Sequence, residues 1–201
     1  MLEKSRVSLQ GQDERNYHIF YQLLATTDDV KAQVQVDGLS PADFPITEPR
    51  GQAISDGMKD AQRFTQTLAC LDTMGVGKDD QINILRVVAA ILHLSRLQFE
   101  PLAGDDDASQ LAGDAPNAKT QTVVSQLLGL SSEEDLRTAL CSRQMSLSAV
   151  TETYLVPLNV AQAQGSRTAL ATALYSHLFQ WLIHRVNEST SAPHADVVNK
   201  I

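Results

Sequence analysis

The tetrapeptide Gly75-Val76-Gly77-Lys78 is the part of the sequence nearest to a phosphate-binding loop. Such a loop needs a glycine five positions before Gly77 and a Ser or Thr directly after the lysine, so that backbone N–H groups, an ammonium and a hydroxyl hold the phosphates and their metal ion. Asp72 and Asp79 occupy those two positions. The end of one helix followed by the start of another explains the same residues, and we favour this interpretation.

Other residue types that perform chemistry are also poorly arranged for it. His177 and His184 lie seven residues apart on one expected helix, but no third zinc ligand and no H-E-x-x-H pattern accompanies them. The sequence has no G-x-S-x-G nucleophile motif. Cys70 and Cys141 lie in apolar helical segments, which favours buried, reduced thiols over reactive ones. We therefore expect no catalytic residues, no metal site and no cofactor in this chain.

The composition limits the class of protein further. The chain has 201 residues, of which 43% are hydrophobic and 20% charged, as in globular domains. Sixteen basic and 24 acidic residues give a formal net charge of −8, which argues against nucleic acid as a partner. No apolar run approaches the roughly 20 residues needed to cross a bilayer, so we expect no membrane insertion. We expect a cytoplasmic, soluble protein.

Hydrophobic spacing predicts a mainly α fold with minor β structure. Tyr17, Phe20, Tyr21 and Leu24 recur at intervals of three and four, as on one face of a helix. The expected order along the chain is a short strand region over 1–12, a helical part over 13–98, an acidic surface loop over 99–119, helices over 120–142, a projecting hairpin-like loop over 143–158, one long helix over 159–187 and a connector over 188–201.

Three segments carry distinct patterns. Residues 82–94 are apolar around most of the expected helix, which is typical of a helix in a domain interior. Residues 143–157 alternate with a period of two and include β-branched side chains, which predicts a hairpin. Residues 159–187 carry a long helical stripe and would span roughly 40 Å at about 1.5 Å per residue.

Several stretches, in this order, resemble the myosin motor head. Residues 2–7 resemble the family's "LLEKSRV", and residues 14–24 its "ERNYHIFYQLL"; residues 88–94 are similar to "AAILHLGN", with Ser95-Arg96 in place of Gly-Asn. Residues 151–163 resemble "TETY..P...QA", and residues 167–187 resemble "RDALAK.LY..LF.W.V..VN", with Thr168 replacing Asp. The residues that carry these signatures are Glu3, Lys4, Ser5, Arg6, Arg15, Asn16, Tyr17, His18, His93 and Trp181.

The resemblance implies the helical upper subdomain of a P-loop motor head. In the family the phosphate loop and the first switch precede the segment similar to residues 2–7, and the second switch follows the long helix. We therefore expect this chain to lack the central nucleotide-binding sheet and to be inactive alone. Mg-ATP would bind in the implied full-length parent, an actin-activated ATPase. From the missing sheet we also expect exposed apolar faces on the helices over 82–94 and 17–24.

By the same resemblance, the projection over 143–157 corresponds to a surface that contacts actin. The candidate contact residues are Arg143, Met145, Leu147, Val150, Thr151, Glu152 and Tyr154. The partners implied are actin filaments and the remainder of the motor head, and the localisation implied is the cytoskeleton. The acidic segment over 100–117 corresponds to a second loop near actin, where Asp105-Asp106-Asp107 would repel an acidic filament surface. The long helix would couple the actin-facing projection to the second switch.

Alternatives remain open. Without the resemblance, an ordinary packed hairpin is the less favoured alternative for residues 143–157. The whole chain, expected to be a motor-head fragment, is alternatively a non-motor helical interaction module or a truncated gene product without motor activity.

Overall fold

The computed structural model describes residues 4–7, 10–11, 13–48, 57–146 and 153–191. The fold is mainly helical with two small antiparallel sheets, as predicted. The α-helices are α1 (His18–Leu24), α2 (Asp28–Gln33), α3 (Gly57–Thr73), α4 (Lys78–Leu94), α5 (Ala115–Leu128), α6 (Glu133–Cys141) and α7 (Val160–Ser191). Strand β1 (Phe99–Leu102) pairs with β2 (Asp105–Leu111), strand β3 (Ser142–Ser146) pairs with β4 (Thr153–Pro157), and η1 (Lys4–Val7) and η2 (Pro41–Asp43) are 3₁₀ helices.

Helix α4 forms the centre of the core. Its residues Val88–Leu94 are all buried, and it packs against α1, α5 and α7. Burial of an apolar side chain of this size stabilises the fold by roughly 1.5–3 kcal/mol, which explains why so apolar a helix lies inside. The prediction of a buried helix is confirmed. The exposed apolar faces expected on α4 and α1 are wrong, because the helices of this chain itself cover them.

The helix ends follow local capping chemistry. Ser132 and Asp135 form a reciprocal capping box at the start of α6. Helix α3 ends where Val76 N–H donates to Leu71 O and Gly75 N–H donates to Asp72 O. This pair of bonds needs a left-handed residue, and Gly75 provides it with a φ of 74°.

The expected loop over 99–119 is wrong. Residues 99–111 form the β1–β2 hairpin, and α5 begins at Ala115 because the Asp114 carboxylate accepts the Asn117 N–H and Pro116 suits the first helical turn. The Asn117 side chain then bonds the backbone of Gln98 and Ala112, which orders the connection. The acidic Asp105-Asp106-Asp107 lies exposed at the start of β2.

Both chain ends of the described part also differ from expectation. A strand region over 1–12 was expected, but Lys4–Val7 is the 3₁₀ helix η1. The Val7 carbonyl accepts a hydrogen bond from the buried Asn16 side chain, which also donates to Ile46 O, and so η1 is tied to the core. The connector expected over 188–201 starts later, because α7 continues to Ser191.

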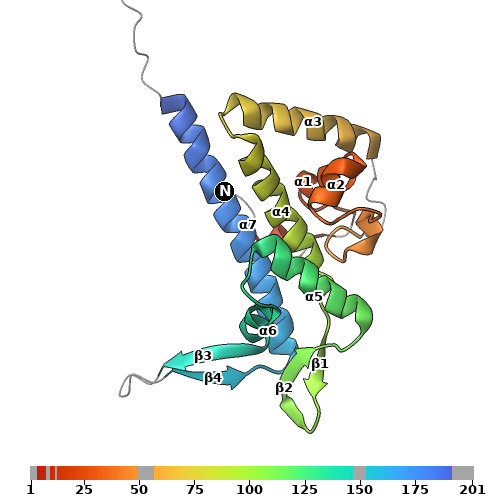
Figure 1. Ribbon diagram of the computed structural model, residues 1–201, viewed down its shortest axis with the longest axis vertical. Coiled ribbons are helices and arrows are strands. Elements are labelled where there is room, and N and C mark those ends of the chain that lie inside the picture. The colour runs from red at the N-terminus through yellow and green to blue at the C-terminus, as the bar shows by residue number, and fades with distance from the viewer. Residues whose placement is uncertain (1–3, 8–9, 12, 49–56, 147–152, 192–201) are drawn as a thin grey trace, which may run out of the picture.

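Figure 1 shows how these elements are arranged. Helix α7 runs along one side of the molecule, α3 crosses one end, and both sheets lie at the other end. The 32 residues of α7 span about 48 Å at 1.5 Å per residue. The long helix therefore connects the end that carries the sheets with the end that carries the α3–α4 turn.

Candidate functional site

The β3–β4 hairpin projects from the body of the molecule (Figure 1). Its register pairs Arg143 with Val156, Gln144 with Leu155, and Met145 with Tyr154. Residues directly opposite each other in an antiparallel pair share a face, so Arg143, Met145 and Tyr154 lie on one face and Leu155 lies on the other. The predicted hairpin is confirmed, and three predicted contact residues lie together on one of its faces.

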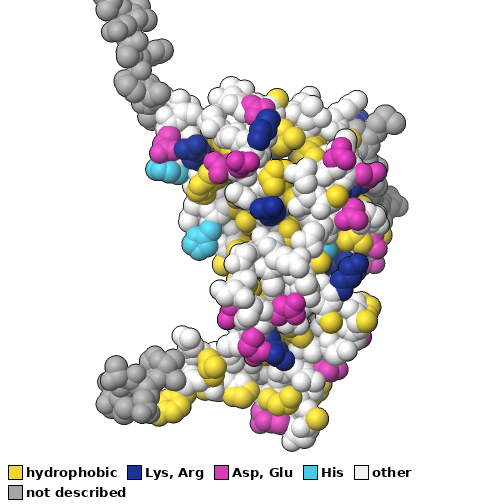
Figure 2. Space-filling view, viewed as in Figure 1, with side chains coloured by type: hydrophobic (Ala, Val, Ile, Leu, Met, Phe, Trp, Pro, Cys, Tyr) yellow, Lys and Arg dark blue, Asp and Glu magenta, His cyan; other side chains and the backbone are white. Residues whose placement is uncertain are grey.

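Both faces of the hairpin expose large apolar side chains. Met145 is 42% exposed, Tyr154 is 47% exposed, and Leu155 is 57% exposed. Figure 2 shows hydrophobic side chains gathered along this projection. Leu155 was missed from the candidate residues, although the period of two over this segment was the signal that would have found it. The other candidates, Leu147, Val150, Thr151 and Glu152, lie outside the described residues.

The base of the hairpin is fixed by buried hydrogen bonds. Ser109 Oγ of β2 donates to Leu158 O at 2.7 Å, and Leu158 N–H donates to Cys141 O at 2.9 Å. Ser142 Oγ donates to Thr138 O at 2.7 Å. These bonds join the hairpin to β2 and α6, so its strands leave a rigid base.

The two cysteines have different surroundings. Cys141 is buried at the base of the hairpin, and this burial raises the pKa of its thiol, which keeps it protonated. Cys70 was expected to be buried as well, and that expectation is wrong. Helix α3 turns its Phe64 and Leu71 side toward the core, and Cys70 lies on its outer side.

Two residues separate the hairpin from helix α7, which packs against the core from Val160 to Leu182. Asn159 Oδ1 accepts the Gln162 N–H at 3.0 Å, and Gln162 Oε1 accepts the Asn159 N–H in return. Arg167 Nη1 donates to Leu97 O at 2.5 Å, and burial lowers the pKa of this guanidinium. The Tyr175 ring stacks on Tyr17 with 4.6 Å between centroids, and burial raises the pKa of the Tyr175 hydroxyl. The first turns of α7 are therefore fixed to the β1 segment and to the start of α1.

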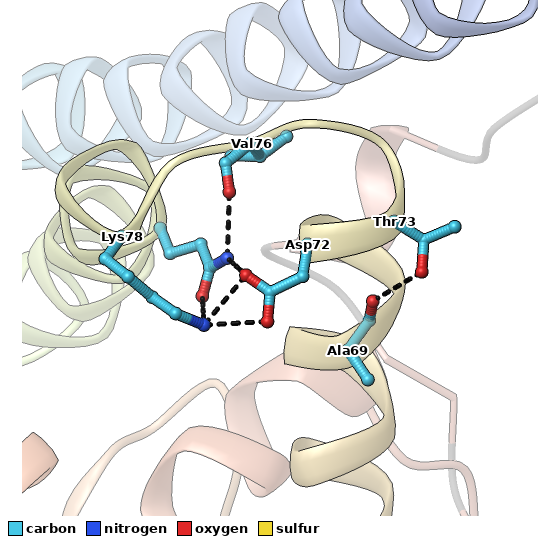
Figure 3. Close-up of polar contacts among 6 residues, drawn as sticks. Ala69, Asp72, Thr73, Val76 and Lys78 are labelled. Atoms are coloured by element: carbon cyan, nitrogen blue, oxygen red, sulfur yellow. Dashed lines mark hydrogen bonds and ion pairs between the residues drawn. The ribbon is translucent and has the colours of Figure 1, made fainter.

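The far end of α7 meets the α3–α4 turn, where Arg185 Nη2 donates to Gly75 O at 3.5 Å. Figure 3 shows the polar contacts that hold this turn. Lys78 Nζ donates to both Asp72 carboxylate oxygens, at 2.8 and 2.7 Å, and Gln81 Nε2 donates to Asp72 Oδ1 and Val76 O. The bond from Lys78, and next the bond from Gln81, lower the pKa of Asp72.

This turn does not fit Mg-ATP. The Lys78 ammonium is paired with the Asp72 carboxylate, whose negative charge would repel a phosphate group. Gly75 and Gly77 serve instead to end α3 and to begin α4. The interpretation as two helix ends is confirmed.

Four of the ten family-signature residues make structural contacts near the start of α1. Arg6 Nη1 lies 3.1 Å from a Glu14 carboxylate oxygen, and Arg15 Nη2 lies 2.5 Å from Asp60 Oδ2. Asn16 bridges η1 and the loop at Ile46, and Tyr17 stacks on Tyr175 as described. These contacts stabilise the fold and do not converge on a reacting centre.

The remaining signature residues are spread over the molecule. His18 is exposed, and Trp181 is 36% exposed with the Arg185 guanidinium 5.8 Å from its ring centroid. His93 is buried, with Nε2 2.8 Å from Gln35 O, and burial lowers its pKa to about 4. Glu3 lies outside the described residues, and Lys4 and Ser5 belong to η1.

Among the residues that the structure describes, no three His, Cys, Asp or Glu side chains are grouped as metal ligands would be. His184 instead lies 3.2 Å from Glu188 on the surface of α7. Within the same residues, no helix has both the length and the apolar character that crossing a membrane requires.

Comparison with known proteins identifies relatives along the whole chain. The family model for the myosin head (motor domain) matches residues 1–201. Unconventional myosin-Va of Gallus gallus is 35% identical over 190 residues, which cover 94% of this chain and 10% of that protein. Myosin-I heavy chain of Dictyostelium discoideum is 32% identical over 194 residues, covering 96% of this chain and 8% of the relative. Myosin IB heavy chain of the same organism is 34% identical over 209 residues, covering 98% and 18%. The chain thus spans less than a fifth of the length of each of these relatives.

Proposed function

Because this chain belongs to the myosin motor-head family, we propose that it forms the actin-facing upper part of the head of an actin-based, ATP-driven motor. The observation that carries the proposal is the projecting β3–β4 hairpin, which exposes Met145 and Tyr154 on one face and Leu155 on the other. An ordinary packed hairpin buries one of its two faces.

The chemistry of the hairpin suits a protein partner. Tyr and Met are enriched at the centres of protein interfaces, where the burial of a few side chains supplies most of the binding free energy. Hydrogen bonds at the base, from Ser109 and Ser142, hold the strands before a partner arrives, which reduces the entropy lost on binding. Arg143 adds a positive charge on the face of Met145 and Tyr154.

The β1–β2 hairpin supports a different role. Asp105-Asp106-Asp107 is exposed and carries three like charges. An acidic filament surface would repel this turn and slow an electrostatically steered encounter. The contact with actin is therefore assigned to β3–β4 and not to β1–β2.

Helix α7 would couple the actin contact to the rest of the head. It starts at the hairpin, stacks on α1 through Tyr175, and reaches the α3–α4 turn through Arg185. A stiff element transmits a shift between two sites when each site favours a different packing of it.

ATP binding is assigned to residues of a longer protein that this chain does not contain. The Gly75–Lys78 turn does not fit the nucleotide, because Lys78 is paired with Asp72. In such a motor, hydrolysis of bound Mg-ATP, a phosphoryl transfer to water, would supply the free energy. The residues described here contribute actin contact and its transmission.

Co-sedimentation with actin filaments tests the hairpin. The chain carrying both Met145→Asp and Tyr154→Asp should bind actin filaments with an affinity at least about tenfold lower than that of the unmodified chain. The reason is that each change places a charge in an apolar contact. Leu130→Asp is the matched control, since Leu130 is 37% exposed but lies in the turn after α5. All variants are compared at one ionic strength, because salt screens charge interactions.

The outcomes separate the two candidate functions. Loss of binding in the hairpin variant, with binding retained in the Leu130→Asp variant, supports actin contact through β3–β4. Equal pelleting of the hairpin variant and the control would refute that contact. A folded chain that does not pellet with actin at all would favour the non-motor interaction module.

A further inference from the structure

A cavity of about 170 Å³ lies between η1, the loop after η2, the end of α4 and the first turns of α7. Among the described residues, Arg167 is the one charged residue of its lining. Ser95 and Thr168 contribute hydroxyl groups, and the rest of the lining is apolar, with Val7 and Ile46 on the wall that faces α7. A single cation therefore faces a small space with mostly apolar walls.

The walls of this cavity are fixed by buried hydrogen bonds. The Asn16 side chain is buried, and its Nδ2 donates to Val7 O at 3.2 Å and to Ile46 O at 2.9 Å. One side chain thus holds two parts of the apolar wall together. On α4, Ser95 Oγ donates to Leu92 O at 2.6 Å. Because the walls are already ordered, a ligand loses little free energy in ordering them.

The Arg167 guanidinium has donors that the protein does not use. Its Nη1 donates to Leu97 O at 2.5 Å, and its Cζ lies 5.9 Å from the centroid of the Phe99 ring. In the part of the chain that the structure describes, no carboxylate pairs with Arg167 and no acceptor bonds its Nε or Nη2. Neither of these two nitrogens is sealed from solvent. They form one edge of the guanidinium, whose two N–H groups match the two oxygens of a carboxylate.

The Thr168 hydroxyl beside Arg167 is also unused. A threonine within a helix commonly donates to the carbonyl four residues earlier, as Thr172 Oγ1 does to Thr168 O at 2.9 Å. Among the described residues, the Thr168 hydroxyl makes no such bond, and its oxygen is not sealed from solvent. It therefore adds a neutral donor to the same lining as the guanidinium.

The lining favours one kind of anion. One guanidinium compensates one negative charge, so the second charge of a phosphate group would lie uncompensated against apolar walls such as Ile46 and Ile91. A carboxylate carries a single charge and accepts from Nε and Nη2 together. Apart from Ser95 and Thr168, the walls offer no hydroxyl to a polar body, so an aliphatic chain fits them better. A cavity of about 150 Å³ holds benzene, a molecule of six carbon atoms, so the space here suits an acid of about that size.

From these features we infer that the cavity binds a short aliphatic monocarboxylate, such as an acid of about four carbon atoms. Its carboxylate accepts from Nε and Nη2 of Arg167 and from the Thr168 hydroxyl, and its chain packs against Val7, Ile46 and Ile91. No residue of the β3–β4 hairpin lines this cavity. The site is therefore independent of actin contact, and its failure would leave the proposed function standing.

The test is a titration of the chain with butyrate, observed by NMR at the Nε–H group of Arg167. Three further probes are compared at the same pH and ionic strength. Butyramide has the shape of butyrate without its charge, acetate has the charge with two fewer methylene groups, and inorganic phosphate has charge without an apolar body. We expect butyrate to bind at least about fivefold more tightly than each of them, because charged hydrogen bonds are stronger than neutral ones and each buried methylene group adds about a factor of four.

Variants of the lining complete the test. Thr168→Asp places a carboxylate in the lining and should lower the affinity for butyrate at least about tenfold, because like charges in one small cavity repel. Thr65→Asp adds the same charge to the exposed surface of α3, outside the lining, and should leave the affinity unchanged. Arg167→Lys keeps the positive charge but loses the paired N–H groups, and should weaken binding about fivefold. Binding of acetate, phosphate or butyramide as tight as that of butyrate, no response of Arg167, or an unaltered affinity in Thr168→Asp would each overturn the inference.

Discussion

The ion pair between Arg15 and Asp60 gives the sharpest stability prediction. Arg15 Nη2 lies 2.5 Å from Asp60 Oδ2, and the Asp60 side chain is 3% exposed. The pair joins the segment before α1 to α3, and the Arg15 guanidinium also lies 3.9 Å from the centroid of the Tyr21 ring. Asp60→Ala therefore leaves a largely buried guanidinium without its carboxylate.

The expected loss is large. Removal of one partner of a buried ion pair costs roughly 3–5 kcal/mol, because the remaining charge stays desolvated. For a chain of this size, 1 kcal/mol shifts the melting temperature by about 2–4 °C, so Asp60→Ala should lower it by about 10 °C. Asp72→Ala is the control: the Lys78 side chain of its ion pair is 72% exposed and the Asp72 side chain 49%, so its loss should lower the stability far less than the loss of Asp60.

Guanidinium denaturation of both variants measures these free energies. A third variant, Arg15→Met with Asp60→Leu, removes both charges and should recover more than half of the loss, since apolar replacements of a buried pair are often neutral. A loss of stability in Asp60→Ala no larger than that in Asp72→Ala would contradict this prediction, as would a double variant no more stable than Asp60→Ala.

Three further predictions concern the core and the hairpin. Burial lowers the pKa of His93 to about 4, below the ordinary 6.5, so only the unfolded state takes up this proton as the pH falls from 6.5 to 4. The free energy of unfolding should therefore fall by up to about 3 kcal/mol over this range. In denaturation curves, His93→Gln should remove this pH dependence, whereas His177→Gln, at an exposed position, should leave it. Gln35 has a φ of 57°, a left-handed backbone conformation that is strained in any residue with a Cβ atom. Gln35→Gly should therefore raise the free energy of unfolding by about 1 kcal/mol, and an unchanged midpoint of denaturation would contradict this strain. Ser109→Ala removes the bond to Leu158 O and should cost about 1 kcal/mol, with faster hydrogen exchange confined to the β3–β4 hairpin; uniform acceleration would argue against local anchoring.

Local patterns predicted much of this fold. The spacing of apolar residues located α4 and α7, and the period of two over 143–157 predicted the β3–β4 hairpin. The capping box of Ser132 and Asp135 at the start of α6 is likewise formed by neighbours in sequence. Each of these features depends on residues within a few positions of one another.

Long-range contacts explain what the sequence did not predict. The acidic run at Asp105 suggested a loop, but Ala108 and Leu111 are buried and bring the segment into a strand. The start of α5 was placed too late because Asp114 and Pro116 were interpreted as loop residues and not as a cap. The contact of His93 with Gln35 joins residues 58 positions apart, so no local pattern revealed it.

Hydrogen–deuterium exchange of the chain with and without actin filaments tests the central claim most directly. The account predicts that filaments protect the amides of β3 and β4, and that the exposed turn at Asp105-Asp106-Asp107 stays unprotected. Protection of the acidic turn, or unchanged exchange throughout β3 and β4 while the chain is bound, would contradict it.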